Sequence, residues 1–400
     1  MSSPRAGGPC IRGGVAPPAG FARRAAPSSC GGEPVSDAIH DGLERLPARR
    51  PTRQVTIGAV TVGGDAPIRV QSMCSTDTRD RKATLAQIRR MEEAGCEMVR
   101  VAVPDREAVA VLPELKRQMQ GPLIADIHFN HRLAVAALEA GADKVRINPG
   151  NIGGPDRVRE VVRAARDHGA ALRIGVNSGS LEQDLLERHG HPSAAALAES
   201  AARHIAFVRE LGFDNVVCSI KSTRVRTSLA AHLLLADQVD VPLHIGITEA
   251  GLPPYGTIKS AAGLGALLLH GIGDTIRVSL TADPVEEVAV AYALLKALEL
   301  RVTSPEVLAC PTCGRIAIDL EKVVREVEHR IQDIRAPLRI AILGCAVNGP
   351  GEAREADVGI AGGKGSGLLF RRGELLRRVP EAELVDALEQ EVRKLAAERP

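Results

Sequence analysis

The stretch KVRINPGNIGGPDRVREVVRAARDHGAALRIGVNSG (residues 144–179) predicts a strand, a helix and a second strand, in that order. Its first and last parts, 144–150 and 172–179, are rich in β-branched residues, whereas 158–170 is made of helix-forming residues and has Gly169 near its end, as helices often do. Parallel strands need a connection that carries the chain back across the sheet, and this connection is usually a helix. Two strands joined through a helix are therefore expected to run parallel. The stretch therefore indicates a βαβ unit.

The same unit recurs along most of the chain. β-branched runs alternate with segments rich in Ala, Leu, Glu and Arg, and eight such runs can be counted. They cover residues 68–73, 97–103, 123–129, 144–150, 172–179, 215–222, 243–251 and 275–281. Eight parallel units predict an α/β fold of the closed (β/α)8 TIM-barrel type. An open, doubly wound sheet is the alternative, but no GxGxxG motif follows the first run.

Composition divides the chain into three parts. Residues 1–50 are rich in Gly, Pro, Ala and Ser and have no acidic residue before Glu33, which predicts a disordered leader or, alternatively, a basic targeting peptide. Residues 51–298 contain the eight runs and form the predicted barrel. Residues 299–400 predict a small α+β domain, with three strands and a helix at 338–344, 357–362, 367–373 and 381–397.

The overall composition excludes several classes of protein. Aromatic residues make up only 2% of the chain and the net charge is +2, so neither base stacking nor a general attraction to nucleic acid is expected. No apolar run is long enough to span a membrane. The eight cysteines of this 400-residue chain follow no apolar signal sequence, which favours a reducing, cytoplasmic environment over a disulfide framework.

A TIM barrel places its active site at the carboxyl ends of its strands, so the polar residues in or just after the runs are the candidates. The candidates are Arg100, Asp126, His128, Arg146, Asn148, Arg173, Asn177, Lys221, Glu249, Arg277 and Ser279. Four arginines and a lysine from five strands would repel one another unless an anion lay between them, and guanidinium groups suit phosphate oxygens. A single arginine could instead be a structural ion pair, but the set as a whole predicts a site for a ligand with two phosphates.

Three of these candidates can move protons. Asp126 and His128 lie two residues apart in one run and so share a face of the strand. Glu249 lies near the end of the seventh run, and its alternative interpretation is a counter-ion to Lys221 or Arg277. The Gly-rich turn at 148–155, which opens a helix, could add backbone N–H donors to the same anion site.

The second domain carries a cysteine site. Cys310 and Cys313 form a CxxC motif, and Cys345 follows about 30 residues later in GCAVNGPGEA. A zinc site with four cysteines would lack one thiolate, although His329 could complete a site of three cysteines and one histidine. The other possibility is an iron–sulfur cluster held by three thiolates, with Glu352 in the Gly/Pro-rich turn as an oxygen ligand. The residues alone leave both possibilities open.

Longer motifs add a resemblance to a known family. CPTCGR and GCAVNGPGEA, together with VQSM, ADIHF, RINPGNIG, RIGVNSGSLE, HIGITEAG and GIGDTIRVSLTADP, occur in this order between about residues 50 and 390. In these motifs the chain resembles the bacterial 4-hydroxy-3-methylbut-2-enyl diphosphate synthases of the methylerythritol phosphate route to isoprenoids. Only the leader departs from the family pattern. GGKGSG at 362–367 lacks the GK[ST] spacing of a phosphate loop.

The resemblance implies a TIM barrel followed by a small α+β domain with a [4Fe–4S] cluster. The implied reaction is the reductive ring opening and dehydration of 2-C-methyl-D-erythritol 2,4-cyclodiphosphate to 4-hydroxy-3-methylbut-2-enyl diphosphate, with two electrons. The implied cluster ligands are Cys310, Cys313, Cys345 and Glu352. The implied substrate-binding residues are Arg100, Arg146, Arg173, Asn177, Lys221, Arg277 and Ser279. The implied catalytic residues are Glu249, Asp126 and His128, and Asn148 is left as a turn residue.

The resemblance also implies partners. Electrons would come from flavodoxin or ferredoxin, and the chain shows no nicotinamide-binding motif. The family forms a head-to-tail homodimer in which the cluster domain of one chain closes over the barrel of the other. The alternative hypothesis is a barrel that acts as a sugar-phosphate lyase or as a binding module, with a structural zinc knuckle.

Overall fold

A computed structural model describes residues 48–345 and 355–399 of the chain. Eight parallel strands form one sheet in the order β8-β7-β6-β5-β4-β3-β10-β9. They are β3 (Arg69–Met73), β4 (Met98–Ala102), β5 (Leu123–Asp126), β6 (Lys144–Ile147), β7 (Ala171–Asn177), β8 (Val216–Lys221), β9 (His244–Ile245) and β10 (Thr275–Ile276). A parallel bridge between Cys218 and Leu243 joins the two ends of the sheet. The predicted eight-stranded barrel is therefore confirmed.

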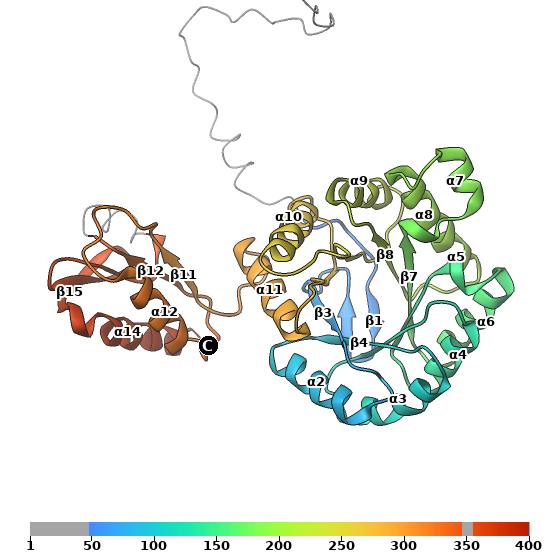
Figure 1. Cartoon of the computed structure of the whole chain (residues 1–400), viewed down its shortest axis with the longest axis horizontal. Helices are drawn as coiled ribbons and strands as arrows, with labels where there is room; N and C mark the ends of the chain where they lie inside the picture. The colour runs from blue at the N-terminus through green and yellow to red at the C-terminus, as the bar shows by residue number, and fades with distance from the viewer. Residues whose placement is uncertain (1–47, 346–354, 400) are drawn as a thin grey trace, which may run out of the picture. The chain divides into compact units, whose positions relative to one another are not determined.

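Helices surround this sheet (Figure 1). They are α2 (Arg81–Glu93), α3 (Arg106–Gln118), α4 (His131–Glu139), α5 (Pro149–Ile152), α6 (Pro155–Asp167), α7 (Gln183–His189), α8 (Ala194–Glu210), α9 (Val225–Ala236), α10 (Tyr255–Leu269) and α11 (Pro284–Ala297). Several begin at a side-chain cap that accepts from a backbone N–H of the first turn, for example Asp80 before α2 and Asp105 before α3. No helix in the described part of the chain has the length and apolar character to cross a bilayer.

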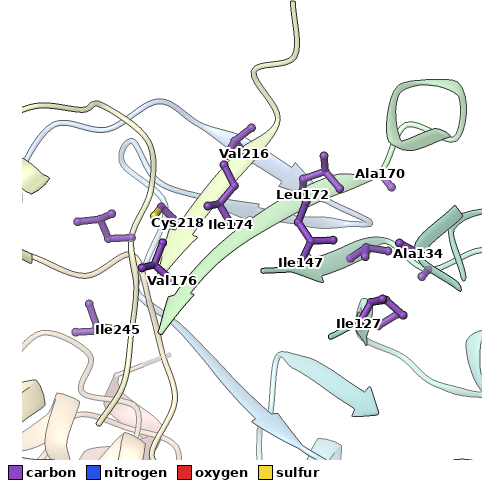
Figure 2. Packing of buried hydrophobic residues seen from close by; sticks show 14 of the residues in the cluster. Ile127, Ala134, Ile147, Ala170, Leu172, Ile174, Val176, Val216, Cys218 and Ile245 are labelled. Carbon is purple, nitrogen blue, oxygen red and sulfur yellow. The ribbon is translucent and has the colours of Figure 1, made fainter. Parts of the chain in front are cut away.

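Each barrel strand presents apolar residues to the helices and polar residues to the interior. In β7, Leu172, Ile174 and Val176 belong to the large apolar cluster that lies between sheet and helices (Figure 2). Because side chains alternate, Arg173 and Asn177 face the opposite way. The interior toward the carboxyl ends of the strands is thus polar, unlike the branched apolar filling of most TIM barrels.

A short hairpin that sequence patterns did not predict closes the amino-terminal end of the barrel. Strands β1 (Val55–Ile57) and β2 (Val60–Val62) pair in antiparallel fashion. Their buried side chains pack in one cluster with residues at or near the starts of four barrel strands. These residues are Met98, Ile124, Ala171 and Val217. The hairpin therefore seals one end with apolar side chains and leaves the carboxyl ends of the strands as the open mouth.

Strands β9 and β10 are only two residues long, much shorter than the runs at 243–251 and 275–281 from which they were predicted. After Ile245 the chain leaves the ladder, and farther along the run Glu249 and Gly251 both have positive φ, 53° and 100°. An extended strand cannot include such residues. The remainder of each run instead borders the mouth, where Arg277 and Ser279 line a pocket and Glu249 is exposed.

The carboxyl-terminal part forms a five-stranded sheet in the order β11-β12-β13-β14-β15. Its elements are β11 (Glu306–Ala309), α12 (Leu320–Arg330), β12 (Arg339–Leu343), β13 (Val358–Ala361), β14 (Ser366–Arg371), β15 (Glu374–Pro380) and α14 (Leu384–Glu398). The first three strands are parallel, and β14 and β15 are antiparallel to their neighbours. Both helices pack on one face of this sheet. The structure thus confirms a second, sheet-containing region after the barrel; β11 and β15 were not predicted.

Candidate active site

The predicted cations converge inside the mouth of the barrel. Arg100 comes from β4, Arg146 from β6 and Arg173 from β7, and their exposed fractions are 3%, 1% and 0%. Lys221 ends β8, and Arg277 follows β10. Burial, together with the neighbouring charges of Arg100 and Arg146, holds the pKa of Arg173 well below its usual value. Five strands therefore deliver five cations to one small volume, as the sequence predicted.

These cations have few hydrogen-bond partners. Within the described residues, none of the three guanidinium nitrogens of Arg173 has one, and the same holds for Nε and Nη1 of Arg100 and for Nε of Arg146. Buried polar groups in proteins are normally paired, and unpaired buried charges are costly. Burial and the surrounding arginines also hold the pKa of Lys221 well below its usual value. The site thus has a large unmet demand for an anion.

Asp126 is the carboxylate at the centre of this cluster. Its oxygens lie 2.5 Å from Arg100 Nη2 and 3.5 Å from Arg146 Nη1, and 3.0 Å from His128 Nε2. Burial alone would raise the pKa of Asp126, but Arg100, His128 and Arg146 outweigh burial and hold it well below its usual value. Asp126 therefore stays ionised at neutral pH and orients the half-exposed ring of His128.

Arg277 is held by a carboxylate that the sequence did not predict. Glu287, which is 4% exposed on α11, places Oε2 3.6 Å from Arg277 Nε, within ion-pair distance but too far for a hydrogen bond. The same carboxylate accepts from Ser72 Oγ at 2.8 Å and from the backbone N–H of Leu280 at 3.0 Å. Glu287 stands in the first turn of a helix, where acidic residues are common, so its sequence context did not mark it as special.

Lys144 and His244 are further buried residues that sequence reasoning missed. Lys144 is fully buried, and its ammonium donates to Gln71 Oε1 at 3.4 Å. Burial holds the pKa of Lys144 and that of His244 well below their usual values. A signal existed for Lys144, because it lies two residues before Arg146 in the same strand and so shares its face.

A glycine on β7 leaves room for the side chain of Arg146. A β-carbon at Gly175 on β7 would lie 2.6 Å from Arg146 Nε, so a larger residue would displace the guanidinium. When the Asn177 amide is oriented to satisfy both of its ends, its oxygen accepts from Arg146 Nη2 at 3.0 Å. Asn148 is a turn residue, as predicted, because its side chain caps α5 by accepting from Gly150 N at 3.2 Å.

Glu249 lies at the rim and not among the buried cations. Its side chain is exposed, and the structure gives it no ion pair with Lys221 or Arg277 among the described residues. Its φ of 53° is unusual for a residue with a side chain, and such strained positions concentrate at functional sites. Ser279 lines a small pocket of the mouth together with Lys221, His244 and Arg277.

A larger cavity opens on the other side of the mouth. Its volume is about 380 Å³, and it is lined mainly by apolar side chains, together with Asp126 and His128. The apolar wall includes Met73, Val103 and Ile127, while Phe129 stands 70% exposed at its edge. The mouth therefore has a cationic side and a side with apolar walls, which meet at Asp126.

The three predicted cysteine ligands belong to the carboxyl-terminal part of the chain. Cys310 directly follows β11 and Cys345 follows β12, and because these strands are parallel both residues lie at the same edge. Cys310 Sγ accepts from Gly344 N at 3.2 Å, which places it beside the residue that precedes Cys345. Cys313 is exposed. No group of three possible ligands is close enough to hold a metal within residues 48–345 and 355–399.

The remaining predicted ligands are Glu352, for an iron–sulfur cluster, and His329, for zinc. Glu352 lies outside the described residues. His329, the alternative zinc ligand, is exposed on α12, and the described residues show no metal-binding group that includes it. Cys310 and Cys345 follow neighbouring parallel strands, and Cys313 comes three residues after Cys310. Their thiols are soft donors of the kind that iron–sulfur clusters use, so the donor chemistry of the residues present fits such a cluster.

Comparison with known proteins covers both parts of the chain. Residues 52–292 match the model of the GcpE TIM-barrel domain, and residues 306–394 match that of the GcpE protein C-terminal domain. A relative from Geobacter sulfurreducens is 58% identical over 348 residues, which cover 87% of this chain and 99% of that protein. One from Geobacillus thermodenitrificans is 53% identical over 364 residues, covering 91% and 95%. Both carry the name 4-hydroxy-3-methylbut-2-en-1-yl diphosphate synthase (flavodoxin).

Proposed function

The chain belongs to the GcpE family, and from that premise we propose that it is an oxidoreductase of isoprenoid biosynthesis. Its substrate is 2-C-methyl-D-erythritol 2,4-cyclodiphosphate, and its product is 4-hydroxy-3-methylbut-2-enyl diphosphate. The conversion takes up two electrons, breaks the ring at a carbon–oxygen bond and releases one water. The observation that carries this proposal is the cluster of buried cations with unpaired guanidinium nitrogens.

The two sides of the mouth suit the two halves of this substrate. A cyclic diphosphate brings negative charge to Arg146, Arg173, Lys221 and Arg277, where it would pair with nitrogens that now lack partners. Arg100, Asn177 and Ser279 complete the proposed set of substrate-binding residues. The methyl-bearing carbon skeleton would then lie toward the cavity of about 380 Å³ and contact its apolar wall.

Proton movement follows from the pairing of Asp126 with His128. Because Arg100 keeps Asp126 ionised, Asp126 serves to orient His128, and the half-exposed imidazole is the better proton carrier. Glu249, at the rim near Lys259, is the second candidate for proton transfer. It would hold a substrate hydroxyl and supply the proton with which this hydroxyl leaves as water. Together these three residues are the proposed catalytic set.

The proposed cofactor is a [4Fe–4S] cluster held by Cys310, Cys313, Cys345 and Glu352. When bound, it would pass on the two electrons of the donor one at a time, and it would offer an iron to which a substrate oxygen could bind. The three cysteines would act as thiolates, and the carboxylate of Glu352 would act as a hard, exchangeable ligand. Flavodoxin, named for the relatives, or ferredoxin is the proposed electron donor.

The remaining parts of the proposal concern organisation. We propose a leader over residues 1–50, a substrate-binding barrel over 51–298 and a cluster domain over 299–400. The last of these would close over the barrel of a partner chain in a head-to-tail homodimer. The proposed location is the cytoplasm, without binding to nucleic acid or membrane.

The experiment that tests the function uses anaerobically purified full-length protein. Iron and acid-labile sulfide are measured, an EPR spectrum of the reduced protein is recorded, and the cyclic diphosphate is supplied with a reductant. We expect about four irons and four sulfides per chain, and a linear allylic diphosphate identified by mass spectrometry. Colourless protein with zinc and no iron would support the zinc-knuckle alternative, and turnover without any electron donor would support the lyase.

A further inference from the structure

The edge strand β15 carries an exposed surface that the site described above does not use. Its exposed fractions are 56% for Leu375 and 45% for Leu376, and Arg377 and Arg378 are exposed as well. Only Val379 of this stretch is buried. We call Leu375, Leu376, Arg377 and Arg378 the β15 surface. It lies at the outer edge of the second sheet, where β15 pairs with β14 alone.

The arginines of this surface differ from others in the same region. Arg371 pairs with Glu398 at 2.5 Å, and Arg393 pairs with Asp333 at 2.9 Å. By contrast, within the part of the chain that the structure describes, Arg377 and Arg378 form no ion pair. Charged residues on an edge strand can serve simply to prevent sheets from pairing. That purpose does not require two exposed leucines beside them, and a mixed apolar and basic patch is typical of a protein-binding surface.

Strand register places this surface in line with the cysteines. Leu343 of β12 is level with Ala361, Ala361 with Leu368, and Leu368 with Arg378. Leu343 is followed two residues later by Cys345. Neighbouring strands are about 4.8 Å apart, so the three steps from β12 to β15 span about 14 Å. A protein seated on β15 would therefore lie within electron-transfer reach of the cysteine edge.

Both the charge and the position favour one kind of occupant. We propose that the β15 surface is the docking site for an electron-carrier protein with an acidic face. The proposal rests on the function proposed above, because only a reductive enzyme needs such a partner. Arg377 and Arg378 attract the carrier and set its orientation, while Leu375 and Leu376 supply apolar contact area.

The test compares a protein donor with a small one. The double variant Arg377→Glu/Arg378→Glu is assayed on the cyclic diphosphate with purified flavodoxin and, separately, with dithionite. We expect the KM for flavodoxin to rise about tenfold or more, because opposite charges become like charges. The rate with dithionite should stay at the wild-type value, since the small reductant does not need the docking surface. Raising the salt concentration should increase the KM for flavodoxin of the wild type and leave that of the variant nearly unchanged.

A matched control keeps the charge change but moves it to another place. Lys322→Glu/Arg325→Glu on α12 changes the net charge equally at exposed positions of the same region. This control should leave the KM for flavodoxin within about twofold of the wild type if the effect is local. An equal rise in both double variants would overturn the docking site and leave only a general charge effect.

Further outcomes separate the possibilities. A normal KM for flavodoxin in Arg377→Glu/Arg378→Glu would overturn the proposal and leave the arginines the role of preventing edge pairing. A loss of dimer in this variant, measured by light scattering, would instead assign the β15 surface to a second copy of the chain. If wild-type protein with an intact cluster shows no turnover with dithionite, the proposed function itself fails. The docking proposal fails alone when dithionite supports turnover and the variant keeps its flavodoxin KM.

Discussion

Arg173 shows how strongly the barrel interior departs from an ordinary protein core. Its guanidinium is fully buried, it has no hydrogen-bond partner among the described residues, and its nearest charged neighbours include other arginines. A buried cation in such surroundings destabilises the free protein. A diphosphate bound at the proposed site would remove this penalty, so affinity and stability would be linked through the same side chains.

Glu287 offers a test of this linkage at a residue outside the proposed binding set. Glu287→Gln removes the charge that balances Arg277, while an amide can still accept from Leu280 N. We expect the free protein to lose about 1–3 kcal/mol of stability. Inorganic diphosphate should restore most of it, so the rise in melting temperature on adding diphosphate should be larger in the variant.

The control for Glu287 is its exposed neighbour. Glu286→Gln removes a charge of the same sign from the same helix turn and should leave both melting temperatures nearly unchanged. If diphosphate stabilises Glu287→Gln and the wild type equally, Glu287 does not balance Arg277 and only ties α11 to Ser72.

Lys221 should take up protons when the anion binds. Burial and the charges of Arg100 and Arg173 lower its pKa in the free protein from the ordinary 10.5, and a bound diphosphate would raise it again. At a pH between the pKa of Lys221 in the free protein and its pKa in the complex, binding of diphosphate adds a proton to Lys221. The affinity for diphosphate therefore falls as pH rises through that interval. Calorimetry with inorganic diphosphate in buffers of different ionisation enthalpy measures the uptake.

The matched variant for this titration is Lys221→Met, which keeps the apolar stem without the ammonium. When diphosphate binds, this variant should take up fewer protons than the wild type at the same alkaline pH. The protons bound by diphosphate itself are the same for both proteins and cancel when the two uptakes are subtracted. Identical uptake in the two proteins would mean that Lys221 stays fully charged in the free site.

Side-chain alternation explains which of these residues could be predicted. Arg100, Arg146 and Arg173 could be predicted as site residues because each is a charged residue within a β-branched run. A charge has no structural use on the apolar face that packs against the helices, so these side chains are expected to face the barrel interior. Lys144 follows the same rule and was missed only because it begins its strand. Glu287 could not be found this way, since it reaches the site from a helix and only tertiary packing brings it to Arg277.

At the scale of elements, the strands that define the barrel were predictable and the hairpin was not. The eight runs each combine β-branched residues with a following helix, which gives a repeated signal. Strands β1 and β2 have three residues each and occur once, so no repeat identifies them. Strand β15 carries charges at an exposed edge, and its sequence therefore lacks the apolar alternation of a half-buried strand.

The hairpin should nevertheless contribute substantially to stability. Ile57 is fully buried and packs in the cluster that closes the amino-terminal end of the barrel. Ile57→Ala should lower the free energy of unfolding by about 2–5 kcal/mol, because it removes apolar contacts and leaves a cavity. Thermal unfolding followed by far-UV circular dichroism would measure the change.

The neighbouring Thr56 is the control for the hairpin. Its side chain is exposed, while its backbone groups bond to Asn215 at 3.1 and 3.0 Å. Thr56→Ala keeps these backbone bonds and should change stability by less than about 0.5 kcal/mol. A small effect of Ile57→Ala would show that the barrel tolerates an open amino-terminal end.

At the scale of the whole molecule, the proposed chemistry requires two sets of residues from different parts of the chain. The cations lie in the barrel, whereas the cysteines lie at one edge of the second sheet, and no sequence pattern links the two. Composition and motif order predicted both parts, but which chain supplies each part of one working site depends on assembly. A symmetric homodimer has two equivalent sites, and each could be built from one chain or from both.

Complementation between two inactive variants distinguishes these arrangements. Arg146→Ala/Lys221→Ala disables the barrel, and Cys310→Ala disables the proposed cluster, so each protein alone should be nearly inactive. When both are co-expressed, a head-to-tail dimer of one chain of each kind has one site with an intact barrel and an intact cluster domain. Random pairing should then restore about one quarter of the wild-type activity, measured as diphosphate product formed per dimer.

The opposite arrangement predicts no recovery, because a site built within one chain always carries one of the two defects. A third sample, with all three substitutions in one chain co-expressed with the wild type, controls for expression and pairing. Its mixed dimers should have no working site in the head-to-tail arrangement and one working site when each chain serves itself. Recovery in the first mixture, together with inactive mixed dimers in the second, would establish that the cluster domain serves the barrel of its partner.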